Sequence, residues 1–351
     1  MTDTLTKFTY QTFQQGKNYF ALAHKMLSTR LMNLISPVDR QTKPISNEVI
    51  LKIQQRLNNL QEVEWEDAEQ GVYPKNLLFD NPWEEFFLYY PLVWLDLPEI
   101  WARTKQKKYQ DFAPEVDVSG YPSYYIQNFH HQTNGYLSDL SANLYDLQVE
   151  ILFGGTADAM RRRILAPLKT ALDVFNDVPP RQRRVLDIAC GTGRTLRMIR
   201  AALPQVSLFG TDLSPAYLRK ANELLSQTPG ELPQLLQANA EELPYVDNYF
   251  HAVTSVFLFH ELPATARQRV IEECYRVTKP GGVFIICDSI QMSDSPEMEL
   301  VMESFHETFH EPYYKHYMTD DLVGRLEKAG FENIETQVHF MSKYLIARKG
   351  G

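Results

Sequence analysis

Residues 183–194 read Arg-Arg-Val-Leu-Asp-Ile-Ala-Cys-Gly-Thr-Gly-Arg, and this stretch decides the fold. Val185, Leu186 and Ile188 form a short apolar run with β-branched members, which predicts a buried strand of a parallel sheet. Apolar residues three apart in 195–200 predict a helix directly afterwards. The glycine-containing turn between strand and helix leaves backbone N–H groups free, so a ligand can approach the chain there.

A second strand is expected over residues 205–211, and it ends at Asp212. In nucleoside-binding α/β folds an acid about 20 residues beyond the turn accepts hydrogen bonds from ribose hydroxyls. A dinucleotide-binding turn would carry another glycine three residues after Gly193, but that position is Leu196. The turn and the acid therefore point to one nucleoside ligand, and the missing glycine disfavours a dehydrogenase.

The run from Val185 to Gly193 resembles the first motif of the class I S-adenosylmethionine-dependent methyltransferases. The likeness is greatest to the small-molecule branch that contains the ubiquinone and menaquinone biosynthesis methyltransferases. One position departs from the motif, because Ala189 stands where the first glycine is usual. An alanine is small enough that the methionine end of the cofactor is still expected to fit.

The resemblance implies S-adenosyl-L-methionine as the cofactor and covers about the last 170 residues. The turn would face the methionine moiety, Asp212 the ribose, and the turn after the third strand the adenine. Asn239 stands there in place of the usual acid and can still hydrogen-bond the exocyclic amine. The expected cofactor contacts are Asp187, Ala189, Cys190, Gly191, Gly193, Asp212, Leu213, Asn239, Ala240, Glu241 and Phe257.

Strand and helix patterns alternate from Arg183 onward, as in a doubly wound α/β sheet. The resemblance implies a class I methyltransferase-like fold with a seven-stranded, mostly parallel sheet whose final strand runs antiparallel. We expect two regions, an N-terminal helical cap or substrate region over 1–134 and the cofactor-binding methyltransferase domain over 135–351. The further expected elements are strands over 233–239, 249–259 and 283–288, a helix over 319–329 and a hairpin from 331–338 and 340–347.

The region before residue 134 reads as helical. Ser46 or Asn47 can begin one helix. Aromatic residues crowd the interval 83–101, which Pro91 and Pro98 divide. Core packing is favoured for this interval, and peripheral contact with a membrane or an apolar ligand stays open. An earlier helix that ends before Pro37 carries an apolar residue at every third or fourth position, at Phe20, Ala23, Leu27, Leu31 and Leu34.

Two helices are expected to lead into the sheet. Ser138 can cap the first. Thr156 can cap the second, which would run to about residue 174 with a kink or break at Pro167. Three consecutive arginines, 161–163, are expected to form its solvated edge.

Segment 124–136 is dense in aromatic rings, amides and imidazoles, which are costly to bury unless each has a partner. Two interpretations stay open for it, a satisfied structural network or a segment that covers the cofactor and lines the acceptor pocket. In the resembled family the segment just before the core often closes over the cofactor.

His260 and Glu261 follow the fourth strand at the edge where ligands bind in open α/β sheets, so both are expected near the acceptor, and the candidate catalytic residue is His260. It can serve as a general base, or it can hold the loop by hydrogen bonds. The insertion over 292–318 falls at the same edge and can choose the acceptor. The expected acceptor-side residues are Tyr136, His306, His310, Tyr313 and Tyr317.

His306-Glu307-Thr308-Phe309-His310 is also a formal His-Glu-x-x-His match, which on a helix would put both histidines on one face for zinc. A zinc-dependent hydrolase, or a metal bound by these histidines in a methyltransferase, are therefore alternatives. A non-catalytic cofactor-binding protein is another. We nevertheless expect no metal, because the α/β pattern already explains the chain.

The net charge of −9 argues against a nucleic-acid partner. The three cysteines lie far apart without metal spacing, which fits a reducing cytoplasm. We expect neither a secretory signal nor a membrane span, and the oligomeric state stays open. The predicted function is methyl transfer from S-adenosylmethionine to a small, apolar or aromatic acceptor at carbon, oxygen or nitrogen.

Overall fold

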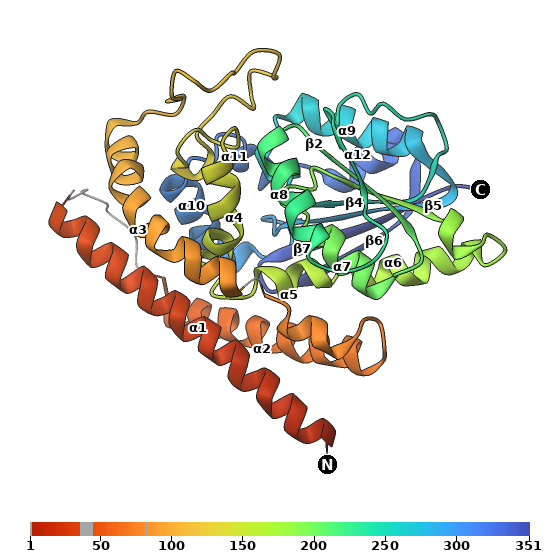
Figure 1. Cartoon of the computed structure of the whole chain (residues 1–351), viewed down its shortest axis with the longest axis horizontal. Helices are drawn as coiled ribbons and strands as arrows, with labels where there is room; N and C mark the ends of the chain where they lie inside the picture. Colours follow the sequence, from red (N-terminus) through yellow and green to blue (C-terminus); the bar gives the residue numbers. More distant parts are fainter. Residues whose placement is uncertain (1, 36–44, 82) are drawn as a thin grey trace.

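The computed structural model describes residues 2–35, 45–81 and 83–351. A sheet flanked by helices occupies one side of the molecule, and long helices from the first part of the chain lie along the other (Figure 1). The termini lie far apart, with the N-terminus at the outer end of the first helix.

The sheet has seven strands in the order β3-β2-β1-β4-β5-β7-β6. The first five are parallel neighbours, and β7 pairs antiparallel with both β5 and β6. The seven-stranded, mostly parallel sheet and the antiparallel final strand are therefore confirmed. The strands are β1 Arg184–Ile188, β2 Ser207–Asp212, β3 Gln234–Gln237, β4 Phe250–Val256, β5 Thr278–Ser289, β6 Phe331–His339 and β7 Ser342–Lys349.

Side chains of each central strand alternate between two cores, because successive residues of a strand point to opposite faces. Leu186 and Ile188 of β1 pack in one core with helices α9 and α12, whereas Val185 packs in the other with α6, α7 and α8. Both faces are thus covered, as a parallel sheet requires. These helices are α6 Leu165–Leu172, α7 Arg194–Ala202, α8 Pro215–Ser226, α9 Ala264–Val277 and α12 Leu322–Ala329.

The remaining helices form the cap and the insertion. The side chain of Ser46 accepts from the amide of Val49, and that of Ser138 from the amide of Ser141, so both predicted caps are confirmed. The helices are α1 Thr2–Ile35, α2 Asn47–Glu69, α3 Trp83–Gln106, α4 Asp139–Leu152, α5 Ala157–Arg162, α10 Glu299–Thr308 and α11 Tyr314–Tyr317. Short 3₁₀ segments are η1 Lys75–Phe79, η2 Phe129–His131, η3 Asp173–Phe175, η4 Pro180–Gln182, η5 Phe259–Glu261 and η6 Pro296–Met298.

Three helix predictions need correction. Helix α3 continues through Pro91 and Pro98 instead of being divided by them. The expected helix over 156–174 is broken, as predicted, but the break falls before Pro167, between α5 and α6, so the proline lies in the first turn of α6, where a missing N–H costs nothing. The Thr156 hydroxyl donates to the carbonyl of Phe153 and does not cap α5.

The arginines at 161–163 are buried, not solvated. Arg161 pairs with Asp158 over 2.8 Å, and Arg162 and Arg163 pair with carboxylates of α2. Burying a guanidinium is costly unless a hydrogen-bonded acid compensates it, and these acids do so. The prediction failed because two of the three acids come from a distant part of the sequence.

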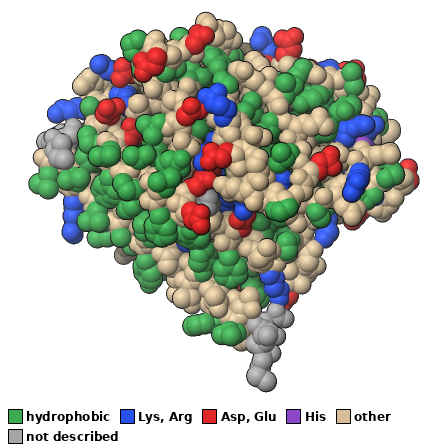
Figure 2. Space-filling view, in the orientation of Figure 1, with side chains coloured by type: hydrophobic (Ala, Val, Ile, Leu, Met, Phe, Trp, Pro, Cys, Tyr) green, Lys and Arg blue, Asp and Glu red, His purple; other side chains and the backbone are tan. Residues whose placement is uncertain are grey.

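The apolar residues that recur along α1 do not form its buried face. Leu27 and Leu34 are 54% and 81% exposed, and the residue that marks the expected stop, Pro37, lies outside the described residues. Hydrophobic side chains gather on the side of the molecule where α1 and α3 lie (Figure 2). The buried face of α1 carries Tyr10, Gln14, Lys17, Ala21 and His24 in place of the recurring apolar residues.

No helix in the described ranges is long and apolar enough to cross a bilayer.

Candidate functional site

The turn after β1 has an unusual backbone. Ala189, Gly191 and Gly193 have φ angles of +50°, +55° and +80°, in the left-handed region that favours glycine. A β-carbon on Gly191 would meet nothing nearer than a Tyr217 ring atom at 3.9 Å, so this backbone faces open space. A β-carbon on Gly193 would lie 3.0 Å from that of Ala221, so the second glycine is needed for helix packing.

Asp212 ties the turn to the tip of β2. Its carboxylate accepts from the amide of Gly191 over 2.9 Å and from the amide of Ser214 over 2.8 Å. Burial raises the pKa of Asp212 to about 6, although these amides favour the charged form. Burial also raises the pKa of Asp187 to about 7, against the hydrogen bond it accepts from Thr254 over 2.7 Å.

A cleft lies over this edge of the sheet and receives most of the residues expected to contact the cofactor. Asp187, Cys190, Gly193 and Glu241 do not line it: Cys190 packs in the sheet core, and Glu241 accepts from Tyr124 over 2.6 Å. Those that line it are Ala189, Gly191, Asp212, Leu213, Asn239, Ala240 and Phe257. The cleft thus offers the backbone of the turn, the carboxylate of Asp212 and the side-chain amide of Asn239, a combination that suits a nucleoside.

Segment 124–136 covers this cleft. Tyr125, Phe129 and Tyr136 line it from above, and the rings of Phe129 and Tyr136 stack with centroids 5.5 Å apart. The Tyr136 hydroxyl donates to the carboxylate of Glu261. The covered volume is about 100 Å³, below the range of about 300–1,000 Å³ typical of ligand sites, so a nucleoside requires the aromatic cover to move.

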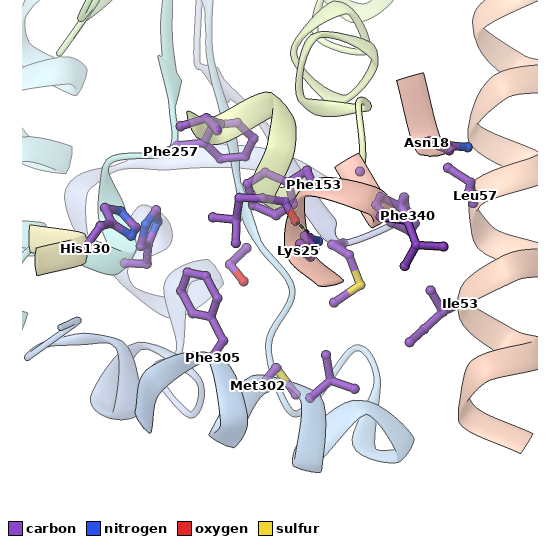
Figure 3. Close-up of a pocket in the computed structure, with 18 of the residues that line it drawn as sticks. Asn18, Lys25, Ile53, Leu57, His130, Phe153, Phe257, Met302, Phe305 and Phe340 are labelled. Carbon is purple, nitrogen blue, oxygen red and sulfur yellow. Dashed lines mark hydrogen bonds between the residues drawn. The ribbon is translucent and has the colours of Figure 1, made fainter. Parts of the chain in front are cut away.

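A second and larger cavity, about 640 Å³ in volume, lies between the cap and the sheet edge. Its walls are mostly apolar, and in Figure 3 His130 and Phe257 lie at one end, with Ile53 and Leu57 of α2 at the other. Some of the lining residues on α1 are exposed to solvent, among them Tyr19 and Leu22. The mouth of the cavity therefore lies beside α1 and α2. We call this the apolar cavity, and the first the nucleoside cleft.

Three residues belong to the walls of both the nucleoside cleft and the apolar cavity: Tyr145, Phe257 and Glu261. Phe257 has a φ of +60°, stacks on Phe153 with centroids 5.8 Å apart, and so is held at the boundary by strained backbone and by packing. The two spaces are therefore adjacent, separated by side chains.

His260 lines the apolar cavity and lies 2.6 Å, Nδ1 to Oδ1, from Asp288. Burial alone would lower its pKa, but Asp288 raises the pKa of His260 to about 9. Asp288 also accepts from the amides of Phe259 and Ser289, over 2.6 and 2.7 Å. This arrangement favours the loop-holding role over that of a free general base.

The insertion residues expected on the acceptor side are not in the walls of the apolar cavity. Helix α10 ends at Thr308, so His306 and His310 do not share a helix face, contrary to the zinc interpretation. Nδ1 of His306 lies 3.1 Å from the carbonyl oxygen of Glu311, and Nε2 of His310 lies 2.7 Å from the amide oxygen of Gln127. Tyr313 packs against Tyr124, and the buried Tyr317 donates to the carbonyl of Ser289 over 2.5 Å.

Sequence reasoning placed Glu261 near the acceptor together with His260, but it missed several other residues in or beside these walls. His130 and Glu261 face each other beside the apolar cavity, and Glu311 lies behind them. Asp288 could have been suspected, because it is the second-last residue of β5, at the ligand-binding edge. Tyr145 could not have been predicted, because it lies on α4, and the apolar pattern of that helix gives no sign of a ligand.

Residues 185–282 match the family described as Methyltransferase domain. The demethylmenaquinone methyltransferase of Thermotoga maritima is 32% identical over 152 residues, 43% of this chain and 59% of that protein. A ubiquinone/menaquinone biosynthesis C-methyltransferase of Methylobacterium nodulans is 28% identical over 167 residues, 47% of this chain and 62% of that protein. The matched region thus spans about three fifths of these relatives.

Among solved structures, human N-acetylserotonin methyltransferase in complex with S-adenosylmethionine aligns with a TM-score of 0.48 and 15% identity. The alignment covers 72% of this chain and 67% of that one.

Proposed function

We propose that this protein transfers a methyl group from S-adenosylmethionine to an apolar aromatic acceptor, because residues 185–282 match the family described as Methyltransferase domain. The carrying observation is the shared wall: Tyr145, Phe257 and Glu261 border both the nucleoside cleft and the apolar cavity. A donor in the cleft and an acceptor in the cavity would meet there. A non-catalytic cofactor-binding protein has no need of the second space.

When bound, S-adenosylmethionine supplies a methyl group on a positively charged sulfur. The turn at Ala189 and Gly191 would hold its methionine end, while Asp212 would accept from the ribose and Asn239 would meet the adenine. In the transfer, the bond between the methyl carbon and the acceptor atom would form as the sulfur–methyl bond breaks, S-adenosylhomocysteine would be released, and the proton lost by the acceptor would pass to water. An in-line displacement needs mainly alignment of the reactants and exclusion of water. The apolar walls and the aromatic cover would supply most of both.

The acceptor's chemistry follows from the cavity's two ends. Apolar side chains line most of it, which suits a lipophilic body, and His130, His260 and Glu261 at the inner end suit hydroxyl or carbonyl oxygens. The names of the relatives make a demethylated naphthoquinol the first compound to test, with methylation at carbon. We assign acceptor entry to the N-terminal cap, within 1–134, because α1 and α2 border the mouth of the apolar cavity.

The buried free thiols at 190, 274 and 287 support a reducing compartment, such as the cytoplasm.

The test uses labelled S-adenosylmethionine with a panel of apolar aromatic acceptors and mass analysis of the products. Leu22→Glu places a charge at the mouth and should raise the acceptor KM at least tenfold while leaving S-adenosylhomocysteine affinity unchanged. Leu5→Glu is the matched control, because Leu5 is 68% exposed on the same helix and outside the cavity wall. Failure of the wild type to bind S-adenosylhomocysteine in calorimetric titration would remove the proposal.

A further inference from the structure

Three potential metal ligands converge beside the boundary of the two spaces. Nε2 of His130 lies 3.0 Å from a carboxylate oxygen of Glu311 and 3.6 Å from one of Glu261. One ligand atom from each residue falls within 4.8 Å of the others, and this is the one such group of three found among the residues that the structure describes. The three come from η2, from η5 and from the link between α10 and α11.

Glu311 is the unusual member. Its side chain is fully buried, yet neither carboxylate oxygen has a hydrogen-bond partner among the described residues, and His130 is the cation that approaches it. A buried carboxylate normally collects several donors, because removing its charge from water is otherwise costly. This carboxylate instead points at His130, in the direction of the apolar cavity that His130 lines.

The backbone on the histidine side is also constrained. His130 and His131 both have left-handed φ angles, +54° and +58°, which a β-carbon makes unfavourable. Strain of this kind persists where the surroundings hold a side chain in one place, and it clusters at ligand sites. Here it aims the imidazole between the two carboxylates.

Charge balance gives a further argument. Even as an imidazolium, His130 carries one positive charge against the two negative charges of Glu261 and Glu311. The nearby His260 is already paired with Asp288, and Arg267 with Asp320, so neither is free to balance the second carboxylate. A divalent cation bound to a neutral imidazole would bring the group to neutrality.

We propose that His130, Glu261 and Glu311 form a binding site for a divalent transition metal. One imidazole nitrogen and two carboxylate oxygens suit Mn²⁺, Fe²⁺ or Zn²⁺. Metal–ligand distances of about 2.0–2.2 Å place neighbouring ligand atoms about 3–3.5 Å apart, so small side-chain rotations would close the group around an ion. The Tyr136 hydroxyl, which donates to Glu261, would orient that ligand from outside.

Three protein ligands leave coordination positions open. Glu261 lines both spaces and His130 lines the apolar cavity, so an open position would face an oxygen of the acceptor. A bound cation lowers the pKa of a coordinated hydroxyl and fixes its position, which would align the acceptor with the donor. This role rests on the proposed methyl transfer, whereas the binding of the metal does not.

The experiment measures metal uptake without donor or acceptor. Chelator-treated wild-type protein is titrated with Mn²⁺, and free Mn²⁺ is followed by electron paramagnetic resonance. We expect one equivalent to bind, and Co²⁺ to give a ligand-field absorption at the same stoichiometry. Glu311→Gln and His130→Gln should each weaken Mn²⁺ binding at least tenfold and abolish the Co²⁺ band.

Matched controls are Glu303→Gln and His316→Gln, which change an exposed glutamate and a half-exposed histidine outside the group and should bind Mn²⁺ as the wild type does. Circular dichroism and S-adenosylhomocysteine titration of every variant establish that the fold and the nucleoside cleft are intact. Wild-type protein that takes up no metal, or uptake that survives in folded Glu311→Gln and His130→Gln, overturns the proposal. Because S-adenosylhomocysteine binding is a separate measurement, failure of the metal site and failure of the methyltransferase assignment are distinguishable.

Discussion

The buried carboxylate of Glu64 pairs with the buried guanidinium of Arg162, 98 residues further along the chain. Glu64 also accepts from the Tyr10 hydroxyl, so a single side chain of α2 joins α1 to α5. Arg163 forms a parallel pair with Asp67 one turn away on α2. The cap is thus joined to the sheet domain by buried ion pairs.

Glu64→Gln should lower the free energy of unfolding by about 3–5 kcal/mol, because it leaves Arg162 buried and uncompensated. Replacing both partners, as Glu64→Leu with Arg162→Met, should recover most of that loss. Urea unfolding followed by circular dichroism measures both values. Arg219→Gln, which breaks an exposed pair with Asp139, is the control and should cost less than about 1 kcal/mol. An equally small loss in Glu64→Gln would contradict the prediction.

Binding of S-adenosylhomocysteine should weaken as the pH falls through about 6. Burial raises the pKa of Asp212 to about 6, and the ionised carboxylate is the better acceptor for ribose hydroxyls. Protonation therefore competes with binding, and the dissociation constant should rise by up to tenfold for each pH unit below that value. Calorimetric titration between pH 5 and pH 8 gives the profile.

Asp212→Asn is the companion variant. It should bind at least tenfold more weakly at pH 7.5, since hydrogen bonds to a charged group are worth about 1.5–3 kcal/mol. Its profile should be flatter, although Asp187 and Glu261 lie near enough to interact electrostatically with Asp212. A wild-type affinity that does not change between pH 5 and pH 7.5 would sink the assignment of Asp212.

The two glycines of the turn should respond differently to a methyl group. Gly193→Ala should destabilise the fold by about 2–4 kcal/mol, because positive φ strain adds to a clash with Ala221. Gly191→Ala should cost only the strain, about 1–2 kcal/mol, and should weaken S-adenosylhomocysteine binding at least tenfold by filling the space it faces. Thermal unfolding and calorimetry on both variants separate the effects. Unchanged affinity in Gly191→Ala would mean that the ligand does not approach this backbone.

Ala189→Gly should stabilise the protein. The alanine has a φ of +50°, a conformation that costs about 1–2 kcal/mol for a residue with a β-carbon, while glycine loses about 0.5–1 kcal/mol more backbone entropy on folding. We expect the free energy of unfolding to rise by up to about 1 kcal/mol, with cofactor affinity kept. Loss of stability would show that the alanine methyl makes contacts that outweigh its strain.

The sheet was predictable because its signals are local. A strand, a glycine turn, a helix and an acid at the next strand tip follow one another within 30 residues, and the hairpin at the end fixes the antiparallel β7. The errors concern partners that are distant in sequence. Arg162 looked solvated because Glu64 precedes it by 98 residues, and His310 was expected on the acceptor side, whereas its ring faces Gln127, 183 residues earlier in the chain.

The candidate site divides in the same way. Ala189, Gly191 and Asp212 could be named from a motif, and the structure places all three in the nucleoside cleft. The apolar cavity could not be predicted, because its walls come from α1, α2, α4, α10 and the link between β6 and β7. Glu261 lies 131 residues after His130, and Glu311 lies 50 residues after Glu261, so only the folded chain brings the three together.

The shared wall at Tyr145, Phe257 and Glu261 has a consequence for how such proteins diversify. In the proposed reaction the donor would be held by the sheet edge, whereas the first two helices line the mouth of the apolar cavity and join the sheet domain partly through buried ion pairs. If the proposed methyl transfer holds, exchange of the first two helices between homologous chains that keep those ion pairs should change the acceptor while leaving binding of the methyl donor intact.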